Sequence, residues 1–76
     1  MKRTWEEFQE YEIEMASKIR ELDKLPSSIE VYDQMIAVYD EFLQELDECP
    51  SENWKRILKP RVVMDKIMIQ QLRDIS

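Results

Sequence analysis

The sequence has no glycine, no histidine and a single cysteine, and each shortage excludes a class of function. Phosphate-cradling loops and the tight turns of a β-rich fold need positive φ, which glycine supplies. Histidine is the commonest general base and metal ligand, and one cysteine forms neither an internal disulfide nor a thiolate zinc cluster. We therefore expect no catalysis, no metal and no cofactor.

The length and composition predict one small folded domain. A chain of 76 residues has room for one hydrophobic core, and 43% hydrophobic residues are enough to fold despite a net charge of −6. No apolar run is long enough to span a membrane, and the first residues lack the apolar segment of a signal peptide. Together with the single cysteine, these features predict a cytoplasmic domain over residues 1–76.

Pro26 and Pro50 divide the chain into three helical segments, because a proline disfavours helical geometry in the residue before it. The expected helices cover about 5–24, 28–48 and 52–75. The predicted fold is all-α: a small three-helix bundle, up-down-up, with the middle helix at its centre.

Polar residues at the start of each segment match helix caps. Thr4 with Glu7 fits a capping box, and Ser27 with Glu30 repeats the pattern. Ser51 is the expected N-cap of the third helix.

Pro60 lies inside the third segment, where it removes a backbone donor and its ring clashes with the preceding turn. The third helix is therefore expected to be kinked or broken at Pro60.

Apolar residues of the first two segments recur at helical spacing and define core faces. The wide arc of the middle segment contains Val31, Tyr32, Met35, Ile36, Val38, Tyr39, Phe42, Leu43 and Leu46. The narrower arc of the first contains Trp5, Phe8, Tyr11, Met15, Ala16, Ile19 and Leu22, and Ile13 falls off it. The wide arc predicts that the middle helix packs against both others, with Tyr39 and Leu43 at the centre of its core face.

In the third segment, the apolar residues point in two directions. The expected core arc contains Val63, Met64, Ile67, Met68, Leu72 and Ile75. Val62 and Ile69 are expected to face away from the core, in a stripe flanked by cations. This second stripe consists of Lys55, Lys59, Val62, Lys66, Ile69 and Arg73. We expect it either to mediate homodimer formation or docking on another protein, or to be covered by the aliphatic stems of its own lysines.

Charge is divided unevenly along the chain. Residues 1–25 carry five basic and seven acidic side chains, residues 26–50 carry none and seven, and residues 51–76 carry six and three. The middle helix therefore has an acidic face without counter-charges of its own. That face consists of Glu30, Asp33, Asp40, Glu41, Asp47 and Glu48.

Two interpretations of this acidic face remain open at the level of sequence. It either attracts the basic edge of the third helix as an antiparallel neighbour, or serves as a docking surface for a protein with a basic surface. Nucleic acid is a less favoured ligand: Trp54, Lys55 and Arg56 resemble a phosphate-gripping cluster, but the pI near 4.6 opposes it.

Glu12 and Cys49 are the two remaining residues of interest. Glu12 falls on the apolar arc of the first helix, so it should find Arg61, Lys59 or a tyrosine hydroxyl as a partner, or reach water at an edge. Cys49 has acidic sequence neighbours and is expected to fill space at a helix end rather than to act as a nucleophile.

These observations favour a small acidic regulator or inhibitor that binds another protein through helix surfaces. The alternatives are a structural, assembly or chaperone-type helical subunit and, less favoured, a nucleic-acid-binding regulator.

Overall fold

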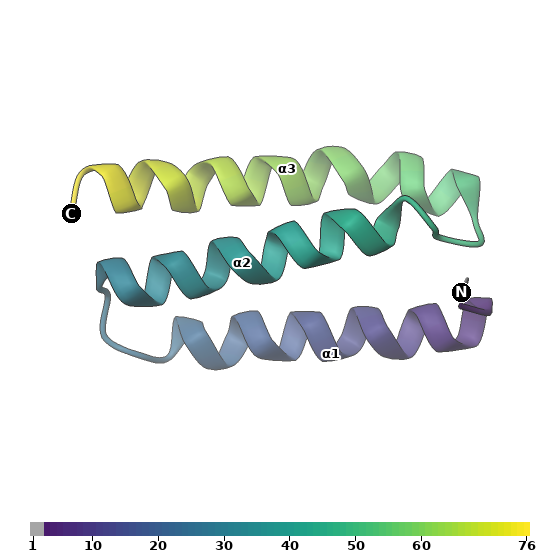
Figure 1. The fold of residues 1–76 in the computed structure, drawn as a ribbon, viewed down its shortest axis with the longest axis horizontal. Coiled ribbons are helices and arrows are strands. Elements are labelled where there is room, and N and C mark those ends of the chain that lie inside the picture. Colours follow the sequence, from purple (N-terminus) through teal and green to yellow (C-terminus); the bar gives the residue numbers. More distant parts are fainter. Residues whose placement is uncertain (1–2) are drawn as a thin grey trace.

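The computed structural model describes residues 3–76, which form three helices. These are α1 (Trp5–Asp23), α2 (Ile29–Leu46) and α3 (Glu52–Asp74). Every helix begins and ends within two residues of its expected bounds. Successive helices run in opposite directions, so the described N-terminal end lies beside the α2–α3 connection and the C-terminus lies near the α1–α2 connection (Figure 1). The predicted all-α, up-down-up three-helix bundle is confirmed.

Side-chain caps begin all three helices, and one of them differs from the prediction. The capping box of α1 is present: the Glu7 amide donates to Thr4 Oγ1 at 3.2 Å and the Thr4 amide to Glu7 Oε1 at 3.0 Å. Ser51 caps α3, as expected. The cap of α2 is Ser28, not Ser27, and it accepts a bond from the Val31 amide at 3.2 Å. The box expected between Ser27 and Glu30 is therefore wrong by one residue, and valine at the third position cannot complete it.

Pro60 lies within a single α3 helix, so the expected break at Pro60 is wrong. Pro60 and Arg56, one turn earlier, are both exposed. Water can therefore solvate the Arg56 carbonyl, which loses its usual backbone partner at Pro60.

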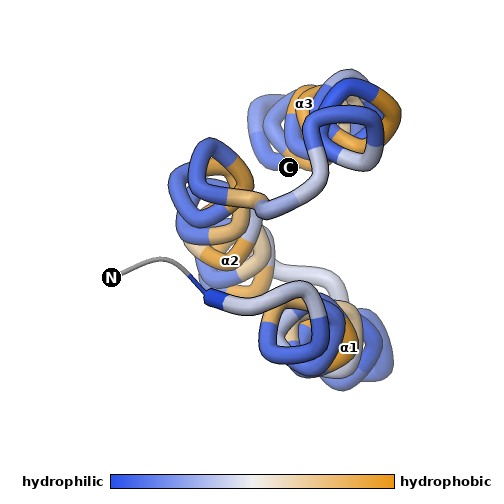
Figure 2. The backbone as a smooth tube through the Cα atoms, turned by 90° about the vertical axis from the view of Figure 1, so that its right-hand side faces the viewer, coloured by the Kyte–Doolittle hydropathy of each residue, from blue (hydrophilic) through white to orange (hydrophobic). Residues whose placement is uncertain are grey.

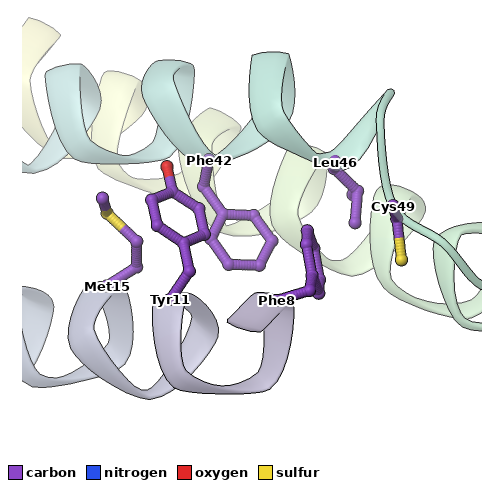
Figure 3. Packing of buried hydrophobic residues seen from close by; sticks show 6 residues of the cluster. All are labelled: Phe8, Tyr11, Met15, Phe42, Leu46 and Cys49. Carbon is purple, nitrogen blue, oxygen red and sulfur yellow. The ribbon is translucent and has the colours of Figure 1, made fainter. Parts of the chain in front are cut away.

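The middle helix is central, as predicted. Viewed along the helices, α1 and α3 each pack against α2 while their own backbones stay apart (Figure 2). Most of the core lies between α1 and α2, where Phe8, Tyr11 and Phe42 form an aromatic group (Figure 3). The Tyr11 and Phe42 rings stack at 5.9 Å between centroids. Met15, Leu46 and Cys49 complete the buried cluster.

The core face of α2 is turned further toward α1 than the sequence predicts. Its buried residues are Met35, Phe42 and Leu46. Tyr39 and Leu43, the expected centre, are only half-buried. Ile13 is 70% exposed, which confirms its place outside the core face of α1.

None of the helices in residues 3–76 combines the length and apolar character that a membrane crossing requires.

Candidate partner-binding surfaces

Half of the acidic face of α2 is paired with α3 inside the chain. Three aspartates of α2 form ion pairs with three cations of α3: Asp33–Arg73, Asp40–Lys66 and Asp47–Lys59. Successive aspartates advance by seven residues while successive cations retreat by seven, as antiparallel neighbours require. The interpretation in which the acidic and basic edges attract each other is therefore confirmed for these three pairs, which we call the ion-pair ladder.

The ladder determines which side of α3 faces α2, and this overturns the expected faces of that helix. Val62 and Ile69 are half-buried, and Val62 packs against the core cluster together with Leu58. The stripe expected to face away from the core thus faces into the bundle. Val62 is therefore partly covered within the fold, and the cations Lys59, Lys66 and Arg73 of this stripe pair with α2.

The residues expected to form the core arc of α3 are on the surface. All six are exposed: Val63, Met64, Ile67, Met68, Leu72 and Ile75. If these residues faced α2, the cations at positions 59, 66 and 73 would be carried away from the aspartates. The ion pairs and the packing of Val62 together favour the observed orientation.

The other half of the predicted acidic face stays free of α3. Glu30, Glu41 and Glu48 are exposed, and no ion pair forms with any of them within residues 3–76. Their spacing of eleven and seven residues puts them on one side of α2. The six predicted residues therefore fall into two sets, one used within the fold and one available.

A shallow groove of about 590 Å³ runs between α1 and α2 on this available side. Its lining is formed by Glu14, Ser17, Lys18, Glu21, Leu22, Gln34, Ala37 and Val38. Apolar atoms of Leu22, Ala37 and Val38 alternate with the carboxylates of Glu14 and Glu21. On α2, Glu41 follows Ala37 by one turn and Glu30 precedes Gln34 by one turn, so both extend its acidic rim. We call this groove, together with the exposed Glu30, Glu41 and Glu48 on the same side of α2, the acidic groove. Its α1 rim was not anticipated from the sequence.

Tyr11 belongs to the buried core cluster and lies close enough to Glu41, Glu45 and Glu14 to be affected by their charge. Its hydroxyl points toward α2, is buried and has no hydrogen-bond partner among the described residues (Figure 3). Burial, followed by the negative charges of Glu41 and Glu45, raises the pKa of Tyr11 to about 12. The Arg3 guanidinium, which lies 4.2 Å from the Tyr11 ring centroid and pairs with Glu45, opposes this shift. The raised pKa therefore reflects mainly the burial of the hydroxyl, with a smaller contribution from the neighbouring carboxylates.

Glu12 does find a partner, but none of the expected ones. Trp54 Nε1 donates to Glu12 Oε1 at 2.6 Å, and both side chains are half-buried. The Trp54 ring also meets the Trp5 ring edge to face, with centroids 6.2 Å apart. These contacts join α1 to the beginning of α3, and an indole donor satisfies the carboxylate without a counter-charge.

A second groove, of about 280 Å³, lies between α1 and α3 above α2. Its lining is formed by Glu12, Met15, Ala16, Ile19, Val38, Tyr39, Phe42, Leu58, Val62 and Asp65. Burial, with nearby Asp65 and Asp23, raises the pKa of Tyr39 in this groove. Met15 and Phe42 of the core cluster line this groove, so it is the part of the core that remains open to solvent.

The remaining residues that the sequence singled out make contacts within the fold. Lys55 donates to the Asp47 carbonyl oxygen at 3.3 Å, so Lys55 and Lys59 both bind the end of α2. Cys49 is buried in the core cluster, as a filler. Within residues 3–76, no group of three acidic or cysteine side chains is arranged to hold a metal ion.

No family model matches the sequence, and neither a curated protein nor a solved structure shows significant similarity to the chain.

Proposed function

We propose that this protein is a regulator or inhibitor that docks, through its acidic groove, on a basic surface of a larger protein. The observation that carries the proposal is the division of the acidic residues of α2. Asp33, Asp40 and Asp47 are neutralised by α3, whereas Glu30, Glu41 and Glu48 on the adjoining side are exposed and unpaired within residues 3–76.

The chemistry of the groove supports a protein as ligand. Leu22, Ala37 and Val38 offer apolar contact area, and Glu14 and Glu21 on the rim attract cations. This combination suits a basic amphipathic segment, whose apolar residues would contact the floor while lysines or arginines reach the rims. Glu14 and Glu21 pair with Lys18 and Lys24 of α1, so the free charge comes from Glu30, Glu41 and Glu48. These three carboxylates repel a nucleic-acid backbone and steer a cationic partner toward this surface.

The proposal is tested by removing the same number of negative charges from two different surfaces. A partner is first captured from an extract of the native host and eluted with rising salt, and its binding rate is then measured with purified variants. Glu30→Gln/Glu41→Gln/Glu48→Gln should slow association at least about tenfold at low salt.

A matched control removes three negative charges from α3: Glu52→Gln/Asp65→Asn/Asp74→Asn. These three side chains are exposed and lie outside the acidic groove, so this variant should bind much like the unmodified protein. An equal decrease of the association rate in both variants would show that only the net charge matters, and would refute docking through the acidic groove. Tight, salt-sensitive binding of duplex or single-stranded DNA by the unmodified protein would refute the proposal in favour of a nucleic-acid ligand.

A role in assembly is the second candidate function. It is favoured by a separate observation, the exposed apolar side of α3.

A further inference from the structure

α3 leaves an unusually large part of its apolar surface uncovered. It is the longest of the three helices and contains no buried residue, whereas α1 and α2 each contain three. Its exposed large hydrophobic residues are Ile57, Val63, Met64, Ile67, Met68 and Leu72, and the C-cap residue Ile75 that follows the helix is exposed as well. Hydrophobic stretches appear on the side of α3 away from α2 as well as on the side toward it (Figure 2). Exposed apolar surface of this extent typically marks an interaction site.

Four of these residues lie on one straight stripe with the spacing of a coiled-coil seam. Ile57, Met64, Met68 and Ile75, with Arg61 and Gln71 between them, follow one another at alternating intervals of four and three residues. That alternation keeps side chains on one line along a helix and is the spacing by which two helices interlock. We call Ile57, Met64, Met68 and Ile75 the dimer stripe.

The stripe is symmetric about its own midpoint. Ile57 and Ile75 are equally distant from position 66, and so are Met64 and Met68. Arg61 and Gln71 are likewise equidistant from it. In a two-fold pair, a residue i that contacts j requires that j also contacts i. An antiparallel second copy therefore places Ile57 on Ile75, Met64 on Met68 and Arg61 on Gln71, with no layer unmatched.

We propose that α3 pairs, through the dimer stripe, with α3 of a second copy of this chain in an antiparallel two-fold dimer. This proposal is independent of the acidic groove, which lies between α1 and α2. It also uses a different surface from the one that the sequence predicts for dimer formation, because the apolar residues of that predicted surface, Val62 and Ile69, face α2.

Charges beside the stripe favour the same arrangement. Arg56 and Asp74 are eighteen residues apart, which is five turns, so they lie on the same side of the stripe. In an antiparallel pair, one flank of the first helix faces the same flank of the second, so Arg56 of each copy approaches Asp74 of the other. On the opposite flank, Asp65 lines the groove near Tyr39 within its own chain.

The size of the chain gives a reason for such a dimer. Domains below about 80 residues rarely bury enough apolar area alone and often gain stability from oligomerisation. Residues 57–75 span about 27 Å along the helix axis. Over this length each helix contributes six residues of the seam, at positions 57, 61, 64, 68, 71 and 75.

The first test measures the mass of the protein in solution by light scattering after gel filtration. The unmodified protein should have twice the 9.3 kDa mass of one chain. Met64→Glu/Met68→Glu should be monomeric with an unchanged helical signal, because both side chains are exposed, at 63% and 58%. Gln9→Glu/Gln44→Glu adds the same charge to exposed positions of α1 and α2 and should remain dimeric.

The second test determines the direction of pairing by disulfide cross-linking in a Cys49→Ala background. Ile57→Cys and Ile75→Cys chains should cross-link when mixed, and neither should cross-link alone, because like positions lie about 27 Å apart in the antiparallel pair. A monomeric unmodified protein, a dimeric Met64→Glu/Met68→Glu variant, or cross-linking of Ile57→Cys with itself would each overturn the proposal.

Discussion

The two sides of α2 hold their neighbouring helices by different means. Toward α1, α2 contributes Phe42 and Leu46 to a buried cluster in which Tyr11 stacks on Phe42. Toward α3, it offers half-buried side chains and a ladder of three ion pairs. Burial of apolar area contributes far more free energy than exposed ion pairs do. The most deeply buried side chains therefore lie toward α1, whereas the ladder, together with the packing of Leu58 and Val62, selects the orientation and register of α3.

This difference also explains where surface remains for partners. The apolar faces of α1 and α2 are buried against each other in the aromatic core, so the surfaces of these two helices consist largely of carboxylates. A helix oriented by ion pairs needs only part of its apolar surface for packing, so α3 keeps Met64 and Met68 exposed. The molecule consequently has an acidic surface and an apolar surface on different helices.

Truncation of the core should have the largest effect and tests the comparison directly. Phe42→Ala should lower the free energy of unfolding by about 3–5 kcal/mol, enough to unfold most of a domain of this size. Val62→Ala, which removes a half-buried side chain on the α3 side, should cost about 1 kcal/mol. Chemical denaturation followed by circular dichroism measures both.

Leu43→Ala serves as the control on α2 itself. Leu43 is half-buried, so its truncation should cost less than that of Phe42. Equal losses for Leu43→Ala and Phe42→Ala would contradict the assignment of the main core to the α1–α2 side.

The helices and their order could be predicted from local signals, but the rotation of each helix could not. Pro26, Pro50 and the cap residues act within one or two turns, so they locate helix ends without knowledge of the fold. The choice of Phe42 over Tyr39 as the core centre depends on the positions of Phe8 and Tyr11 across the interface. A helical arc wide enough for two neighbours does not specify which part of it each neighbour covers.

The orientation of α3 shows the same limit more clearly. Its apolar residues surround much of the helix, so periodicity alone permits either Val62 or Met64 to face α2. The deciding signal is the match of positions 59, 66 and 73 with the aspartates of α2, a relation between two helices. The same limit applies to the candidate site. The acidic face of α2 could be predicted from the sequence, but the pairing of half of its carboxylates with α3 could not.

Tyr11→Phe should stabilise the protein at neutral pH. The Tyr11 hydroxyl is buried without a partner among residues 3–76, so its removal relieves a desolvation cost of about 1–3 kcal/mol. The ring stack on Phe42 is retained, and Arg3 can still lie over the ring. A lower denaturation midpoint for Tyr11→Phe would indicate that the hydroxyl is satisfied by ordered water.

The free energy of unfolding of the unmodified protein should decrease more at alkaline pH than that of Tyr11→Phe. The pKa of Tyr11 is raised to about 12 in the folded state, so the folded protein retains its phenolic proton after the unfolded chain has lost it. Ionisation of Tyr11 therefore leaves the free energy of unfolding unchanged below about pH 10 and lowers it between about pH 10 and 12. The unmodified protein should lose about 2 kcal/mol more than Tyr11→Phe over this range, measured by denaturant titration at each pH. Parallel losses would show that Tyr11 titrates normally.

The bond between Trp54 and Glu12 joins two half-buried groups, so its loss should have a moderate effect on stability. Trp54→Phe leaves the Glu12 carboxylate without its donor and should cost about 1.5–3 kcal/mol, including the lost contact with Trp5. Glu12→Gln retains an acceptor and should cost less than about 1 kcal/mol. Combining the two changes should be less than additive, since they remove the same bond. Full additivity in denaturation experiments would contradict the bond.

The smallest effect is expected for the ladder, where a change of charge sign separates register from stability. Asp40→Asn should cost about 1 kcal/mol, because the Asp40–Lys66 pair is only half-buried and is still screened by water and salt. Asp40→Lys places two cations opposite each other and should destabilise the protein somewhat more, with a loss that shrinks as salt is added. Adding Lys66→Asp to Asp40→Lys reverses the pair and should recover most of that loss, whereas Lys66→Asp combined with an unmodified Asp40 should not. Recovery in the reversed pair would show that what α3 requires from α2 is opposite charge at matching positions seven residues apart. If the reversed pair remained as unstable as Asp40→Lys alone, the orientation of α3 would have to be attributed to the packing of Leu58 and Val62, and the contrast between the two sides of α2 would be one of degree only.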